Sequence, residues 1–212
     1  MFKNAPKTIA IVNLIKGGSG KSTLAVNLTA ATLRANLNTM LIDLDVEQRA
    51  AHKWALKRNI ECQLNPPINK ISNIVKSHDL TIFDTGGYDT GSTQALMTAS
   101  DVILIPTSMS PIETEAFFEL INKINKIKEI LKKDDLNIFI VPNRIQPGVT
   151  STKVAAHFAP LKKLGYKIAP TLYRRTAYEK SYANGGSVFE YNDLKAQSEI
   201  YNLFEKLFNK GK

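Results

Sequence analysis

Residues 13–23, NLIKGGSGKST, contain a glycine-rich run with lysines on both sides. Glycines let the backbone N–H groups of a loop curl around phosphate oxygens without clashes from Cβ atoms. Lys21 is placed to reach the β- and γ-phosphates of a nucleotide, and the Ser22 hydroxyl can ligate Mg²⁺. The spacing predicts a phosphate-binding loop between a strand and a helix. The residues expected to cradle the phosphates are Gly17, Gly18, Ser19, Gly20, Lys21, Ser22 and Thr23.

This loop departs from the standard pattern G-x-x-x-x-G-K-[ST], which has a single lysine near its end. Counting back from Gly20, the first glycine of that pattern would fall at Ile15, where it is missing. Lys16 instead stands directly before the paired glycines. A solvated loop lysine would explain Lys16 without any function, so the residues alone leave its role open.

Three carboxylates end two apolar runs that are expected to be strands. Asp84 ends LTIFD, and a carboxylate at the carboxyl end of a parallel strand can hold a magnesium-bound water. Asp43 and Asp45 end TMLIDLD, and their spacing of two sends both side chains to the same side of a strand. We expect Asp43 and Asp84 to join Ser22 at the metal. Asp45, nearer the following loop, is expected to orient the attacking water, although helix capping or turn chemistry would explain each carboxylate.

Short apolar runs alternate with helical patterns through most of the chain. Runs typical of buried parallel strands occupy residues 8–14, 39–45, 80–85, 101–107 and 137–143. Residues 22–36 and 112–133 have helical spacing, the second with an apolar stripe and a lysine-rich remainder. These units predict an α/β fold with a doubly wound, mostly parallel sheet flanked by helices. We expect residues 1–212 to form a single domain, with residues 65–70 as a loop.

The composition is that of a folded protein with a basic surface. Hydrophobic residues make up 43% and charged residues 22% of the 212 residues. One cysteine, Cys62, excludes an internal disulfide and a cysteine-cluster metal site in a single chain. We expect no signal peptide or membrane span, and a cytoplasmic location. The net charge of +9 indicates a polyanionic partner, either nucleic acid or an acidic membrane, unless it reflects only a solvated lysine-rich surface.

Three segments, KGGSGKST, LIDLD and TIFDTGG, resemble the deviant Walker A P-loop ATPases of the ParA/MinD group. The later stretch YRRTAYEKSYANGGSVFE, residues 173–190, looks like the corresponding segment of small plasmid-partition ParA proteins. The resemblance implies a homodimer that sandwiches two ATP molecules with Mg²⁺. Lys16 would then cross to the partner subunit's nucleotide and neutralise phosphate charge, as an arginine finger does elsewhere. Asn143 stands where related proteins contact adenine, although a strand-terminating turn residue is an equal alternative.

The same resemblance implies a use for ATP. Partition ATPases of this type bind DNA non-specifically as ATP-bound dimers, through phosphates and not bases. A ParB-like centromere-binding adaptor would stimulate slow hydrolysis, and the protein would be nucleoid-associated and not membrane-bound. The candidate DNA contacts are Arg174, Arg175 and Lys180, with Arg175 as the first choice. Lysines within residues 123–133 and 162–163 are weaker candidates.

The sequence also differs from the family pattern near two of the carboxylates. Val46 follows Asp45 where proline is expected, so Gln48 could be displaced by one position. The segment after Asp84 reads TGGYDTG, where family members often have proline. The conformations of both loops therefore stay open at this stage.

Two other functions compete with DNA partition. A MinD-like membrane ATPase would use its C-terminal helix as an interfacial anchor, although the same pattern is typical of a helix docked on a sheet. The apolar residues that share one face of that helix are Ile200, Leu203, Phe204, Leu207 and Phe208. An ATP-dependent biosynthetic enzyme of the dethiobiotin-synthetase type is disfavoured by the paired glycines and Lys16.

Overall fold

The computed structural model describes residues 5–14, 18–87, 91–131 and 136–208. The strands in this part of the chain form one parallel sheet in the order β3-β2-β4-β1-β5-β6-β7. They are β1 (Thr8–Ile11), β2 (Thr39–Asp43), β3 (Cys62–Leu64), β4 (Leu80–Asp84), β5 (Val102–Thr107), β6 (Ile138–Pro142) and β7 (Lys167–Ile168). The helices are α1 (Lys21–Arg34), α2 (Ala50–Lys57), α3 (Ile68–Ser77), α4 (Gly91–Ala99), α5 (Pro111–Leu131), α6 (Ser151–Lys163), α7 (Thr176–Ala183) and α8 (Leu194–Phe208), with a 3₁₀ turn η1 (Val188–Glu190).

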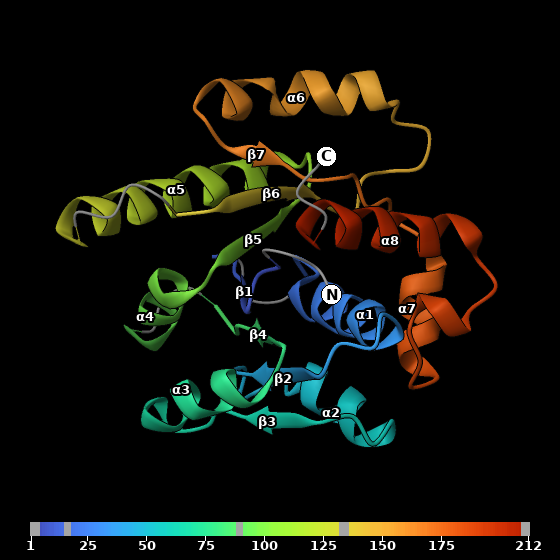
Figure 1. The fold of residues 1–212 in the computed structure, drawn as a ribbon. Coiled ribbons are helices and arrows are strands. Elements are labelled where there is room, and N and C mark those ends of the chain that lie inside the picture. The colour runs from blue at the N-terminus through green and yellow to red at the C-terminus, as the bar shows by residue number, and fades with distance from the viewer. Residues whose placement is uncertain (1–4, 15–17, 88–90, 132–135, 209–212) are drawn as a thin grey trace.

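The doubly wound parallel sheet is therefore confirmed, with helices on both of its faces (Figure 1). All residues of β1, β2, β4, β5 and β6 are buried, as expected for strands that are apolar on both sides. Alternate side chains of each strand enter different clusters. On β1, Ile9 and Ile11 pack with α1, α2 and α8, whereas Ala10, together with Val12 just after the strand, packs with α5 and α6.

Several elements differ from the sequence expectations. The predicted strand over residues 39–45 ends at Asp43, so Asp45 lies in the following loop. The predicted loop over residues 65–70 is wrong in its second half, because α3 begins at Ile68 with Pro67 as its N-terminal cap. Helices α2, α3, α4 and α6 were not predicted. Helices α2 and α6 leave a weak apolar pattern in the sequence, because only three side chains of each helix are buried.

The topology places one loop at the centre of the sheet. Strand β1 lies between β4 and β5. Strands β2, β3 and β4 are on one side of β1, and β5, β6 and β7 are on the other, so the direction of strand order reverses at β1. Ligands of open α/β sheets bind outside the carboxyl ends of the strands at such a switch point. The glycine-rich loop follows β1 and leads into α1 at this position, and Asp84 ends the neighbouring β4.

The C-terminal helix α8 is docked on the sheet. Its predicted apolar face is buried, since all five of those side chains are at most 3% exposed: Ile200, Leu203, Phe204, Leu207 and Phe208. They belong to the same cluster as residues of α1 and of the sheet, beside which α8 lies (Figure 1). The apolar stripe that suggested a membrane anchor is therefore used inside the fold. Among the described residues, no helix has both the length and the hydropathy needed to span a bilayer.

Candidate functional site

Gly20 links the phosphate loop to α1. This residue caps the N-terminus of α1 in the left-handed conformation, with φ of +83°. A Cβ atom at this position would lie 2.5 Å from the side-chain nitrogen of Asn143. Both observations explain why glycine is required here. Lys16 and Gly17 lie outside the described residues, so their predicted roles remain predictions.

Lys21 is a buried lysine at the first turn of α1. It is 6% exposed, and its ammonium group contacts the hydroxyl of Ser19 at 3.4 Å. Burial lowers the pKa of Lys21, while the nearby carboxylates of Asp84 and Asp45 raise it. A buried cation beside the positive end of a helix, with two carboxylates close by, is suited to bind and neutralise a polyphosphate with its metal.

Asp84 is fully buried at the end of β4, next to the phosphate loop. Neither carboxylate oxygen has a hydrogen-bond partner of normal geometry in the part of the chain that the structure describes. Burial raises the pKa of Asp84 to about 7, with an opposing contribution from the Ser22 hydroxyl. Buried polar atoms without partners are rare in folded proteins. Because Mg²⁺ prefers carboxylate and hydroxyl oxygens, Asp84 and Ser22 fit a magnesium site.

Asp43 has a different environment from Asp84, although it was also predicted to be near the metal. One of its oxygens accepts the backbone N–H of Asp45 at 2.9 Å, and the other accepts that of His52, also at 2.9 Å. Asp43 thereby ties the loop after β2 to the first turn of α2. Burial raises its pKa, and the two backbone N–H groups lower it. Its proposed contact with metal stays a prediction.

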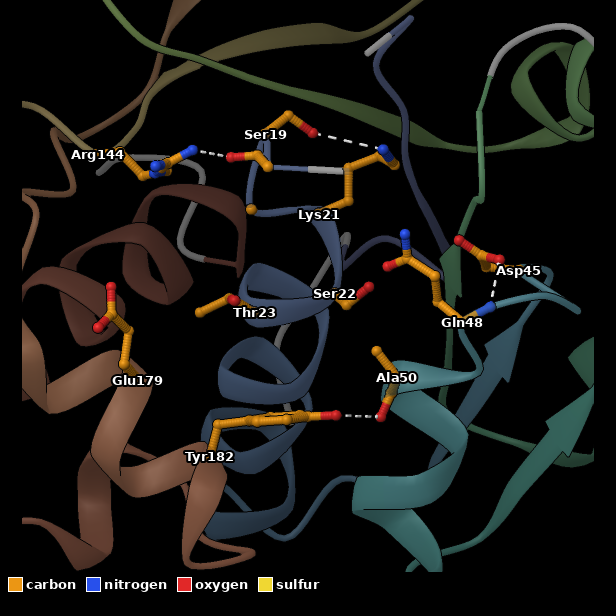
Figure 2. Close-up of a pocket in the computed structure, with 12 residues that line it drawn as sticks. Ser19, Lys21, Ser22, Thr23, Asp45, Gln48, Ala50, Arg144, Glu179 and Tyr182 are labelled. Carbon is orange, nitrogen blue, oxygen red and sulfur yellow. Dashed lines mark hydrogen bonds between the residues drawn. The ribbon is translucent and has the colours of Figure 1, made fainter. Parts of the chain in front are cut away.

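Asp45 lies on the loop at the edge of the cavity in front of the phosphate loop. Its Oδ1 accepts the backbone N–H groups of Glu47 at 3.1 Å and Gln48 at 2.9 Å. The other oxygen has no such contact among the described residues and is available to the cavity. The side chain of Gln48 also lines this cavity, so either residue could orient a water (Figure 2).

Two residues that follow β6 donate hydrogen bonds to the phosphate loop. The Asn143 amide nitrogen donates to the backbone carbonyl of Ser19 at 2.9 Å, and the Arg144 guanidinium donates to that of Gly18. Arg144 has a φ of +55° and is exposed, yet it reaches across to the loop (Figure 2). Asn143 was predicted as an adenine contact; the structure places it beside the phosphate loop, and its adenine contact stays a prediction. The contribution of Arg144 was missed, because nothing in its local sequence points to the loop.

The phosphate loop opens into a cavity of about 330 Å³ whose walls come from distant parts of the chain. The lining residues are Gly18, Ser19, Gly20, Lys21, Ser22, Thr23, Asp45, Gln48, Ala50, Arg144, Glu179 and Tyr182. Glu179 and Tyr182 reach the cavity from α7 and were not predicted (Figure 2). The Tyr182 hydroxyl donates to the carbonyl of Ala50 at 2.9 Å, which joins α7 to the start of α2.

A smaller side pocket adjoins this cavity and shares Gly20, Thr23, Arg144 and Glu179 with it. Its other lining residues are Leu24, Asn143, Leu172, Tyr173, Arg174, Arg175, Tyr178 and Ile200. Apolar and aromatic side chains form much of this wall. The combined shape, a polar cradle with an apolar side pocket, suits a phosphate chain attached to a flat organic group.

The three candidate DNA contacts have unlike surroundings. Arg174 and Lys180 are exposed, which suits contact with a polyanion. Arg175 is bound by Glu199, with its Nη2 at 2.7 Å and its Nε at 2.8 Å from the same carboxylate oxygen. Only 22% of the Arg175 side chain is exposed. Its charge is therefore largely neutralised by Glu199 within the fold, and a DNA contact by Arg175 stays a prediction.

Comparison with known proteins identifies relatives along the length of the chain. The family described as CobQ/CobB/MinD/ParA nucleotide binding domain matches residues 9–188. Maintenance of carboxysome distribution protein A of Gloeobacter kilaueensis is 31% identical over 213 residues, covering 95% of this chain and 94% of that protein. Protein ParA of Rhizobium radiobacter is 24% identical over 189 residues, covering 85% of this chain and 84% of that protein.

Solved structures agree on the fold. MinD of Aquifex aeolicus matches with a TM-score of 0.73 at 17% identity, covering 97% of this chain and 98% of that one. A putative plasmid partition protein of Borrelia burgdorferi bound to AMPPNP matches with a TM-score of 0.67 at 22% identity, covering 97% of this chain and 100% of that one. The family match spans most of the chain and includes the phosphate loop, Asp43, Asp45 and Asp84, and all residues that line the cavity. The chain therefore belongs to the CobQ/CobB/MinD/ParA nucleotide binding domain family.

Proposed function

We propose that this protein is an ATPase that positions a cargo by binding non-specific DNA in its ATP-bound, dimeric state. The observation that carries the nucleotide part is the presence of two buried charged groups at one phosphate loop: Lys21, and Asp84, whose oxygens have no hydrogen-bond partner of normal geometry among the described residues. A cation for the phosphates and a carboxylate for their metal are the two charges that phosphoryl-transfer sites require.

Each residue of the site has a defined task in this proposal. The backbone N–H groups at the start of α1 and the ammonium group of Lys21 bind the phosphates. Ser22 and Asp84 hold Mg²⁺, which neutralises phosphate charge during transfer. Asp45 orients the attacking water, and Lys16 acts on the nucleotide of the partner subunit. The side pocket receives the base and the sugar.

The proposal that this protein binds DNA is supported by its net charge and by the names of its relatives. The net charge of +9 favours a polyanionic partner, and two of the candidate contacts, Arg174 and Lys180, are exposed. Relatives with known names include a carboxysome distribution protein and a ParA protein. The cargo proposed here is accordingly either a plasmid, as the sequence resemblance suggests, or a protein assembly. An adaptor on that cargo, ParB-like for a plasmid, would stimulate hydrolysis.

A MinD-like membrane role is the less favoured alternative. It requires an apolar helix face that can leave the protein and enter a bilayer. The burial of Phe204 and Phe208 in α8, at 3% and 2% exposure, means that such a release would cost several kcal/mol of burial energy at about 1.5–3 kcal/mol per large side chain.

The nucleotide part is tested by titrating ATP–Mg²⁺ into the full chain and into two lysine variants. We expect Lys21→Ala to weaken ATP binding at least about tenfold, because charge-assisted bonds to phosphate are lost. Lys153→Ala, at an exposed lysine of α6, should bind as the unaltered chain does. Equal binding by both variants, or hydrolysis by neither the unaltered chain nor Lys153→Ala, would contradict the proposal.

A further inference from the structure

Glu199 of α8 is a buried carboxylate that lines neither nucleotide pocket. It is 8% exposed, accepts three hydrogen bonds and makes a further ion-pair contact with Arg175. One oxygen accepts both Arg175 contacts, at 2.7 and 2.8 Å. The other accepts the Tyr178 hydroxyl at 2.9 Å and the backbone N–H of Tyr173 at 3.2 Å. Buried charges are tolerated when they are paired and hydrogen-bonded in this way, and such networks fix a single arrangement.

All three donor residues line the side pocket beside the phosphate loop. Tyr173 and Arg175 lie on the segment that joins β7 to α7, and Tyr178 lies in the first turn of α7. The backbone of that segment is hydrogen-bonded to the end of β6 and to the residues that follow it. The backbone N–H of Arg174 donates to Ile145 at 2.7 Å, and that of Leu172 donates to Pro142 at 2.8 Å. These bonds tie the backbone of the segment to the end of β6, whereas Glu199 ties the side chains of Arg175 and Tyr178 to α8.

The strength of the network is visible in its partners. Hydrogen bonding to Glu199 raises the pKa of Arg175. Burial, together with the Glu199 charge, raises the pKa of Tyr178. Arginine and tyrosine are protonated hydrogen-bond donors at neutral pH in any case, and both shifts have the direction expected for donors bound to a carboxylate.

The phosphate loop is held by other residues. Asn143 and Arg144 donate to its carbonyl groups from the end of β6, and Glu199 contacts neither of them. Different side chains thus hydrogen-bond to the phosphate loop and to Arg175 and Tyr178 of the side-pocket wall, while Asn143 and Arg144 line the side pocket as well.

We propose that Glu199 is a positioning residue for the nucleoside portion of the nucleotide. It holds Tyr173, Arg175 and Tyr178 in the arrangement that forms the side-pocket wall, and it does not act on the phosphate chain. This inference rests on the proposed nucleotide-binding function, because it assigns the side pocket to the base and sugar.

The test compares two ligands that share phosphates and differ in the nucleoside. Dissociation constants for ATP–Mg²⁺ and inorganic tripolyphosphate–Mg²⁺ are measured with the full chain, with Glu199→Gln and with Glu205→Gln. The Glu205 variant makes the same chemical change on the same helix, at a residue that lines neither pocket. We expect Glu199→Gln to weaken ATP binding by about tenfold, since one charge-assisted contact is worth this much, and to leave tripolyphosphate binding within about twofold. Glu205→Gln should change neither constant.

Equal weakening of both ligands by Glu199→Gln would show a general structural role and overturn the inference. No change in either constant would also overturn it. If Glu199→Gln fails to fold, Tyr178→Phe removes one donor and keeps the ring, and a selective loss of ATP affinity of about threefold is expected. Failure of the unaltered chain to bind either ligand would overturn the proposed function itself, and the inference with it.

Discussion

The side-chain nitrogen of Asn143 donates a hydrogen bond to the Ser19 carbonyl at 2.9 Å and lies where a Cβ atom on Gly20 would be placed. The end of β6 and the phosphate loop, more than a hundred residues apart in sequence, therefore fit together at a point with no room for a side chain. The shape of the nucleotide cradle depends on this contact.

Gly20→Ala is expected to abolish nucleotide binding, because the new methyl group would displace Asn143 and distort the loop. The left-handed backbone at Gly20 adds a strain of about 1–2 kcal/mol for any L-residue. Titration of ATP–Mg²⁺ measures the binding, and thermal unfolding measures the strain.

The matched control for this variant is Gly165→Ala. Gly165 has a similar φ of +89°, but a Cβ atom there would meet nothing within 4 Å. It should lose comparable stability and retain nucleotide binding. Loss of binding in both variants would mean that strain, and not the contact with Asn143, explains the requirement for glycine.

Asp84 is expected to make the ligand-free protein less stable as the pH rises. Its pKa is raised to about 7 in the folded chain, above its ordinary value of 3.8, so the folded state binds more protons between these values. Stability contributed by the protonated form is therefore fully present below about pH 3.8, falls as the pH rises from there, and is gone above about pH 7. Unfolding midpoints measured from pH 5 to pH 8 test this dependence.

Asp84→Asn should flatten this pH dependence, because the amide cannot ionise. It should also remove the gain in ATP affinity that Mg²⁺ provides. Measurements with and without Mg²⁺ separate the two effects. A variant that keeps the full magnesium dependence would remove Asp84 from the proposed metal site.

Asp45→Asn is expected to bind ATP and to lower the turnover rate by about a hundredfold or more, the usual contribution of a group that activates the nucleophile. Asparagine retains an oxygen that can accept the backbone N–H groups of Glu47 and Gln48, so the loop should keep its shape. The parallel variant Gln48→Ala tests the neighbouring candidate and should change turnover less than about fivefold. The reverse order of effects would assign the water-orienting role to Gln48.

Arg174→Ala should weaken DNA binding and reduce the slope of log affinity against log salt by about one, as expected for loss of one phosphate contact. Its unfolding temperature should stay unchanged, because the side chain is exposed. Arg175→Ala should instead lower the free energy of unfolding by about 3–5 kcal/mol, since the carboxylate of Glu199 would be left buried without its cation. DNA retention assays at several salt concentrations, with thermal unfolding, measure both quantities.

Much of the fold could be predicted because parallel strands buried on both faces leave a simple apolar signal. The phosphate loop was equally accessible, since Gly20, Lys21 and Ser22 are consecutive and their chemistry depends on spacing. Roles created by tertiary packing could not be predicted. Glu179 reaches the cavity from a helix far along the chain, and nothing in the sequence near it indicates this position.

The partners of the charged side chains could not be predicted from the sequence either. The resemblance to partition ATPases made Arg175 the first-choice DNA contact, which stays a prediction, but nothing in the sequence showed that its guanidinium binds Glu199, 24 residues away. Asp43 and Asp84 both end apolar strands and looked alike. The start of α2 supplies a backbone N–H to Asp43, whereas Asp84 faces the phosphate loop without a partner among the described residues. Such differences depend on which helix follows the strand and where it packs.

The most direct test of the central claim is a competition between random-sequence DNA and anionic liposomes for the purified protein. The mixture is separated once in ATP–Mg²⁺ and once in ADP–Mg²⁺, and the protein in each fraction is measured. The account predicts that DNA captures the protein in ATP–Mg²⁺ and releases it in ADP–Mg²⁺, with little on the liposomes in either case. Capture by liposomes, or equal capture by DNA with both nucleotides, would contradict it.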